Sequence, residues 1–150
     1  GTSWTEVNDL NTGRSYVGAA GIATAALAAG GYTGSIQSIT ESWNGTNWTE
    51  VNDLNTARYI LNGAGTYTAA LAIGGDTNPP SGGSLTNTED WNGASWVEVA
   101  DLSTDRDGGG SGGSSTSAFL AAGRTGPSSG VTTATEEWSG SSDTIKVLTD

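Results

Sequence analysis

The sequence predicts an all-β protein assembled from repeated antiparallel sheets. Three observations carry this prediction: a motif that occurs three times in 150 residues, Asn-Gly pairs between aromatic-rich flanks, and stretches that alternate with a period of two. Asn-Gly between such flanks is a strong hairpin signal. No stretch has helical periodicity or a helix cap followed by an apolar stripe. We therefore expect strands throughout.

The repeat keeps a fixed register along the chain. The opening segment GTSWTEVNDLNTG returns as GTNWTEVNDLNTA from Gly45 and, more diverged, as GASWVEVADLSTD from Gly93. An Arg follows each copy, a run of small residues comes next, and each unit closes on an acid, one further residue and a Trp. These landmarks define one domain with units 1–44, 45–92 and 93–139 and a tail, 140–150.

Each unit divides into four expected strands. Strand a follows the Arg, strand b is the small-residue run, strand c ends at the closing Trp, and strand d begins after Asn-Gly. Four strands in about 40 to 50 residues are typical of a β-propeller blade, and Ala and Gly suit the crowded strands near its axis. The segment 108–115, GGGSGGSS, has the composition of a linker. It keeps the register of strand a, however, so we expect a strand there.

The order of the landmarks resembles the kelch repeat over almost the whole chain. In the second unit these landmarks are Gly74, Gly75, Glu89, Trp91, Trp96, Leu102 and Arg106. The closing Trp stands where kelch repeats more often have Tyr, and the third unit has Ala122 in place of the first Gly. The amino-acid sequences of the units also resemble kelch-type repeats of tailed-phage structural proteins. The resemblance implies an all-β, kelch-like β-propeller with three four-stranded blades per chain.

Three blades are fewer than the 4 to 8 of typical propellers, so we expect a head-to-tail homodimer that forms a six-bladed ring. Gly1–Leu10 would be a strand d that completes the third blade of the partner. The tail Ser142–Asp150 also resembles a strand and could fill the same slot. We favour the N-terminal segment, because Trp4 matches Trp48 and Trp96. The alternative is a piece cut from a longer propeller, with the tail as its true last strand.

Composition excludes several kinds of site. The chain has no Cys and no His, which removes disulfides, the Ser-His-Asp and Cys-His triads and the usual zinc and copper sites. Its 16 acids and 5 bases give a formal net charge of −11, which disfavours nucleic acid and anionic membranes as partners. The uncharged segment 17–32 is short and recurs later, so we expect no membrane span. No cofactor, metal or compartment is indicated.

The recurring Arg and Trp residues are expected to be structural. An Arg that occurs once per unit beside a matched acid is expected to pair with that acid or with loop carbonyls, rather than to surround an anionic ligand. A Trp tied to the repeat is expected to pack between blades rather than to stack on a sugar. The residues are Arg14, Arg58 and Arg106; Trp4, Trp48 and Trp96 on strand d; and Trp43, Trp91 and Trp138 at the end of strand c.

Candidate ligand-binding residues lie in the b–c loops, where all length variation between the units falls. Loops that vary on a constant frame are common binding surfaces, although ordinary tolerant loops are the alternative. The candidates are Tyr32, Asp76, Asn78 and Arg124. Carboxylates that recur on strand d are expected to form a solvated rim, because identical blades lack the asymmetry of a catalytic pair.

These features predict a non-catalytic, self-assembling module that binds a glycan or a protein or has a structural role. A phage virion or fibre component is one form of it. The alternative is an engineered or evolution-model half-propeller whose only property is assembly into a symmetric ring. An enzyme is disfavoured, because kelch-fold copper oxidases need His and Cys and kelch-like glycosidases carry asymmetric insertions. This chain has neither.

Overall fold

The computed structural model describes residues 1–79, 82–126 and 130–140. Within these ranges every regular element is a β-strand, and the strands form antiparallel sheets of two to four strands, so the all-β prediction is confirmed. The described residues contain no helix, and therefore none that could cross a membrane. The expected tail strand at 140–150 lies outside them except for its first residue.

Two four-stranded sheets repeat the same meander, with each strand paired to the next one along the chain. Sheet I consists of β1 (Gly18–Ile22), β2 (Ala25–Ala29), β3 (Thr40–Trp43) and β4 (Trp48–Val51). Sheet II consists of β5 (Asn62–Thr66), β6 (Ala69–Ile73), β7 (Thr88–Trp91) and β8 (Trp96–Glu98). The strands of each sheet correspond in order to the expected strands a to d.

Sheet III has three strands among the described residues, in the order β9, β10, β13. They are β9 (Gly110–Gly113), β10 (Ser117–Ala121) and β13 (Thr135–Ser139). The segment with linker composition thus contains a strand, as its register predicts. The variable loop between β10 and β13 carries a separate two-stranded ribbon, β11 (Arg124–Thr125) and β12 (Gly130–Val131).

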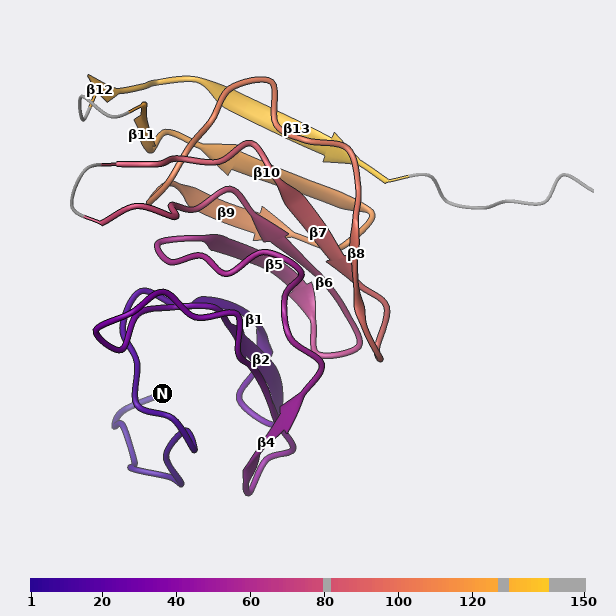
Figure 1. Cartoon of the computed structure of the whole chain (residues 1–150). Coiled ribbons are helices and arrows are strands. Elements are labelled where there is room, and N and C mark those ends of the chain that lie inside the picture. Colours follow the sequence, from indigo (N-terminus) through magenta and orange to yellow (C-terminus); the bar gives the residue numbers. More distant parts are fainter. Residues whose placement is uncertain (80–81, 127–129, 141–150) are drawn as a thin grey trace, which may run out of the picture.

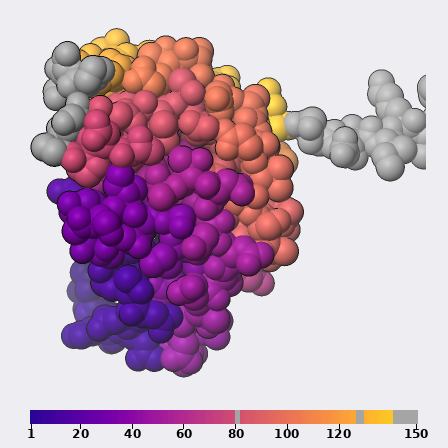
Figure 2. All heavy atoms as spheres, in the orientation of Figure 1, coloured from indigo at the N-terminus to yellow at the C-terminus, as the bar shows by residue number. Residues whose placement is uncertain are grey.

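The N-terminal segment, expected to act as a strand d, forms no strand within a single chain. Residues 1–10 are almost entirely exposed, and Trp4 is fully so. A strand needs a neighbouring edge with which to exchange hydrogen bonds. The segment lies beside sheet I, whereas the open edge at β13 lies at the opposite end of the molecule (Figures 1 and 2).

The three sheets stand side by side and meet along their first strands (Figure 1). Strand β1 contacts β5, and β5 contacts β9. The approach is so close that a Cβ at Gly63 in β5 would overlap the carbonyl oxygen of Ala19 in β1. The small residues of these strands therefore let the sheets meet with their backbones nearly in contact.

Two apolar clusters fill the spaces between the sheets. Between sheets I and II the cluster contains the buried residues Leu27, Ala29, Leu54, Leu61, Ala70, Ala72, Trp91 and Trp96. Between sheets II and III it contains Ala64, Leu71, Ile73, Ala118 and Leu120, with Leu102 and Trp138 packed against them. Most members of the second cluster stand one repeat after a member of the first.

We predict that Gly63→Ala destabilises the fold by about 1–3 kcal/mol, the usual range for overpacking a tight contact. Chemical unfolding followed by tryptophan fluorescence measures this change. The control is Gly110→Ala in β9, where an added Cβ meets nothing within 4 Å, and its effect should stay within about 0.5 kcal/mol. Equal effects of the two variants would contradict the close approach of β1 and β5.

Candidate functional site

A buried ion pair recurs at the same position in each unit. The pairs are Arg14 with Glu41, Arg58 with Glu89, and Arg106 with Glu136. Each Arg therefore contacts the acid of its own unit, as the structural interpretation of these residues expects. The side chains of the first two pairs have no exposed surface, whereas that of Glu136 on β13 is 24% exposed.

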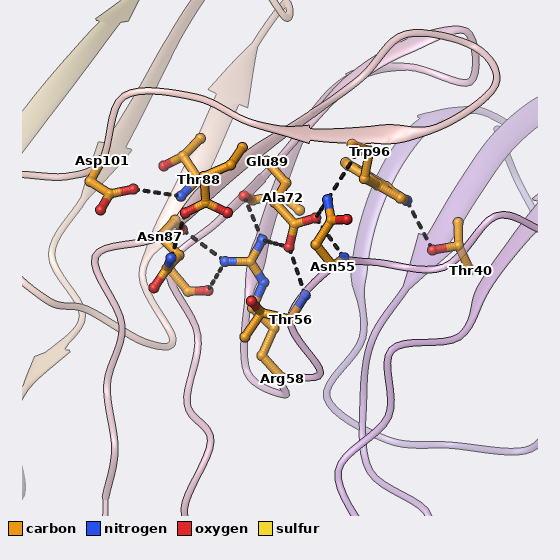
Figure 3. Close-up of polar contacts among 12 residues, drawn as sticks. Thr40, Asn55, Thr56, Arg58, Ala72, Asn87, Thr88, Glu89, Trp96 and Asp101 are labelled. Carbon is orange, nitrogen blue, oxygen red and sulfur yellow. Dashed lines mark hydrogen bonds and ion pairs between the residues drawn. The ribbon is translucent and has the colours of Figure 1, made fainter.

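The Glu89 carboxylate on β7 binds the connection between sheets I and II (Figure 3). Arg58 donates to it at 3.0 Å. The main-chain and side-chain N–H groups of Asn55 both donate at 2.8 Å, and the main-chain N–H of Thr56 donates at 3.3 Å. The remaining guanidinium bonds go to the main-chain carbonyls of Ala72, Gly74 and Asn87. One carboxylate thus fixes how the chain enters sheet II.

The same arrangement ties the N-terminal segment to sheet I. Glu41 on β3 accepts hydrogen bonds from Arg14, from the main-chain and side-chain N–H groups of Asn11, and from the main-chain N–H of Thr12. Burial by itself raises the pKa of Glu41, but these hydrogen bonds outweigh it, so the pKa lies below its ordinary value. The pKa of Glu136 is lowered by the same balance of burial and hydrogen bonds.

The tryptophans make two kinds of contact. Each closing Trp donates its indole N–H to a main-chain carbonyl in the turn before the second strand of its own unit: Trp43 to Ala23, Trp91 to Tyr67 and Trp138 to Ser115. Trp96 instead reaches the neighbouring sheet and donates to the Thr40 hydroxyl at 3.1 Å (Figure 3). Of the strand d tryptophans, Trp96 is buried, Trp48 is half-buried and Trp4 is exposed.

Three of the candidate ligand residues occupy equivalent positions in successive units. Each pairs through its main chain with the residue that directly follows the repeat Arg: Tyr32 with Ser15, Asp76 with Tyr59, and Arg124 with Asp107. The structure therefore brings Tyr59 and Asp107 to this end of the stack, and the sequence analysis did not select them. Both directly follow a repeat Arg, and this constant position is the sequence signal by which they could have been selected.

An aromatic cluster lies at this loop end. The ring centroid of Tyr59 is 5.9 Å from that of Tyr16 and 5.7 Å from that of Tyr32. Burial, and next the charge of Asp76, raise the pKa of Tyr59. Tyr16 is exposed and has a φ of 59°, in the left-handed region that non-glycine residues seldom adopt. The cluster exposes the ring of Tyr16 to solvent, whereas Tyr59 is buried and Tyr32 is half-buried.

The side chains of the two charged candidates, Asp76 and Arg124, are engaged within the protein. The Asp76 carboxylate is buried and accepts a hydrogen bond from the main-chain N–H of Asn78 at 2.6 Å, so it closes a turn. Asn78 itself is exposed. Arg124 donates to Asp107 at 2.8 Å, and this bond raises the pKa of Arg124. Tyr32 and Arg124 are half-buried at the same end of the stack.

The recurring carboxylates of strand d are spread along the sheets. Asp53 accepts a hydrogen bond from the main-chain N–H of Thr40, and Asp101 accepts the equivalent bond from Thr88. These carboxylates tie the end of strand d to the start of strand c. Across residues 1–79, 82–126 and 130–140, no group of three or more acidic side chains is arranged to hold a metal ion.

We predict that Glu41→Gln destabilises the chain by about 3–5 kcal/mol at pH 7, because it leaves a buried guanidinium without its charge partner. The lowered pKa of Glu41 contributes stability that is present above the ordinary carboxyl value of about 4.3 and is lost as the pH falls below it. The variant should therefore lose less stability than wild type below that value. Glu50→Gln, at the exposed position opposite Glu41 on β4, is the control in urea unfolding across pH. An equal response of the two variants would contradict the prediction.

Comparison with known proteins identifies a similar fold. No protein-family model and no curated protein matches the sequence. Among solved structures, that of YjhT superimposes with a TM-score of 0.71 over 82% of this chain, at 14% sequence identity. The chain spans 42% of the length of that protein. At this identity the likeness concerns the fold, so this chain is similar in architecture to part of YjhT.

Proposed function

We propose that the chain is half of a kelch-like β-propeller, and that two copies close head to tail into a ring of six sheets. The ring acts as a non-catalytic module with a structural or binding role. The observation that carries the proposal concerns the first and last sheets of the stack. There, no other described residues cover side chains whose repeat equivalents are buried between sheets.

The face of sheet III supports the proposal most directly. Leu27 on β2, Leu71 on β6 and Phe119 on β10 hold the same repeat position. Leu27 and Leu71 are 2% and 1% exposed, because the following sheet covers each of them, whereas Phe119 is 46% exposed. A further sheet packed on sheet III would bury this aromatic side chain as it buries the two leucines.

The face of sheet I has the complementary feature. Trp96 in sheet II is buried against sheet I and bonds to Thr40, whereas Trp48, its equivalent in sheet I, is half-buried. In the ring, Trp48 would lie against sheet III of a second copy, where Thr135 corresponds to Thr40. Because the first and last faces differ, copies join head to tail, and two joints close the ring.

The fold comparison fits a chain that is smaller than its complete assembly. The similarity covers less than half of YjhT, and the sheets of this chain meet along β1, β5 and β9, as sheets arranged around an axis would. A ring of two copies supplies the missing sheets without any added sequence. The engineered or evolution-model ring remains the alternative reading of this same assembly.

We predict a native mass near twice 15.0 kDa for the wild-type chain, measured by light scattering on a sizing column. Phe119→Ser should shift the mass to that of one chain, because a polar side chain replaces the aromatic ring at the joint. The control is Tyr67→Ser, which removes an aromatic side chain of similar exposure, 48% against 46%, from a turn away from the joint. A wild-type monomer would overturn the ring.

A ligand-binding role is the second candidate, and the tyrosine cluster favours it. Tyr16 is 60% exposed, and its ring lies 5.9 Å from that of the buried Tyr59. Its left-handed backbone belongs to the repeat, because Ile60 and Gly108 hold the equivalent positions with φ of 54° and 65°. The exposed aromatic ring is therefore what distinguishes this position in the first unit. Tyrosine presents an apolar face and a hydroxyl, which suits a sugar ring. The net charge of −11 favours a neutral glycan over an acidic one.

We predict that the wild-type chain binds neutral glycans on an array and that Tyr16→Ala abolishes the signal. Tyr67→Ala, an exposed tyrosine on the turn between β5 and β6, should leave it unchanged. Assembly without any glycan signal would favour the purely structural role and the engineered alternative, whereas equal losses in the two variants would indicate nonspecific aromatic binding.

A further inference from the structure

The contact made by Trp96 serves as an internal reference for how adjacent sheets are joined. Trp96 is 6% exposed, and the centroid of its ring lies 5.4 Å from that of Trp91 on the paired strand β7. It donates to the hydroxyl of Thr40 on sheet I at 3.1 Å. Leu27 from sheet I and Leu54 from the connection belong to the same cluster. One indole therefore fills the joint between sheets I and II.

Among the residues that the structure describes, the joint between sheets II and III repeats these surroundings without the indole. Leu71, Leu102, Thr88 and Trp138 stand one repeat after Leu27, Leu54, Thr40 and Trp91. They line an open hollow whose empty volume, with its solvent-open part included, is about 370 Å³. Trp138 is half-buried there, whereas Trp91 is buried. We call this hollow, lined by these residues with Ile73 and Leu120, the tryptophan socket.

The N-terminal segment has the sequence that fits this socket. Its residues 1–12 differ from residues 45–56 only at position 3, where Ser replaces Asn. Trp4 holds the same repeat position as Trp48 and Trp96, and it is 103% exposed. The segment thus carries an unburied copy of the side chain that the socket lacks.

The segment is also held in the required place relative to sheet I. The side-chain amide of Asn8 donates to the main-chain carbonyl of Thr46 at 2.9 Å, and Asn52 at the end of β4 makes the equivalent bond to Ala94 at 2.8 Å. The Asn11 bonds to Glu41 repeat those of Asn55 to Glu89. The segment therefore approaches sheet I as β4 approaches sheet II, and it is positioned as the last strand of a preceding sheet.

We infer that the tryptophan socket is a binding site for Trp4 of a second copy, which rests on the proposed ring. The occupant comes from another copy because the N-terminal segment and β13 lie at opposite ends of the molecule (Figure 2). The pairing of β3 with β4 and of β7 with β8 gives the register. Trp4 lies opposite Trp138, Val7 lies opposite Thr135, and the Trp4 indole N–H donates to the Thr88 hydroxyl.

The first test is a double-mutant cycle on the dimer dissociation constant, measured by sedimentation with the full chain. Trp4→Phe keeps a ring without the donor, and Thr88→Val keeps the shape without the acceptor. Each should weaken the dimer about five- to 150-fold, the value of two hydrogen bonds, because dissociation breaks both joints of the ring. The double variant should be no weaker than the weaker single variant. Thr40→Val, which alters the intramolecular reference pair, should lower unfolding stability and leave dissociation unchanged. Independent, additive effects of Trp4→Phe and Thr88→Val would overturn the indole–hydroxyl bond.

The second test uses the absence of Cys from the sequence. A Val7→Cys chain mixed with a Thr135→Cys chain should form a disulfide-linked pair on a nonreducing gel, since opposed strand residues meet disulfide geometry. Val131→Cys, at an exposed position on β12, replaces Thr135→Cys in the control mixture and should give no link. Suppose that the wild-type chain is a dimer, but the disulfide does not form and Trp4→Phe leaves the dissociation constant unchanged. The proposed ring would then stand and the tryptophan socket would be overturned. Occupation of the socket by residues 142–150 would also overturn it. A wild-type monomer would overturn the ring itself.

Discussion

Removing a carboxylate from water is costly unless hydrogen-bond donors and an opposite charge replace the lost hydration. Glu89 meets this requirement with donors from three positions of one connection, Asn55, Thr56 and Arg58. Because the acid sits on the third strand and its donors precede the first, each carboxylate ties the segment that enters its sheet to that sheet. In sheets II and III this segment comes from the sheet before. The stack depends on this repeated interaction, and the apolar clusters fill the space that it defines.

An architecture built from such joints has nearest-neighbour character. Each sheet contacts only the sheets on either side, so an internal joint is complete while the two ends of the stack are not. The differences in exposure between Leu71 and Phe119, and between Trp96 and Trp48, follow from this position and not from residue type. Incomplete ends on an otherwise repeated stack are the physical basis for the proposed ring and for the tryptophan socket.

The two proposed roles use different parts of the repeat. Assembly uses strand d and the sheet faces, where the register is constant. Ligand binding uses the loop end, where Tyr59, Asp76 and Asp107 break the equivalence of the units although their backbones pair in the same way. A constant frame with varied loop residues allows the recognition surface to change without altering the joints.

The sequence by itself determined the strand order and the hairpins, because these depend on local turn chemistry and on spacing within one unit. For the same reason it limited the partners of each Arg to the matched acid or loop carbonyls. It also predicted a strand, β9, within GGGSGGSS, because the constant repeat register was a stronger signal than the linker-like composition. Only the tertiary structure decided which side chains are buried: Asp76 closes a turn, Tyr16 and Tyr59 meet across units, and Trp4 stands exposed. Burial depends on whether a neighbouring sheet is present, and a repeated sequence contains the same residues at an internal joint and at an open end.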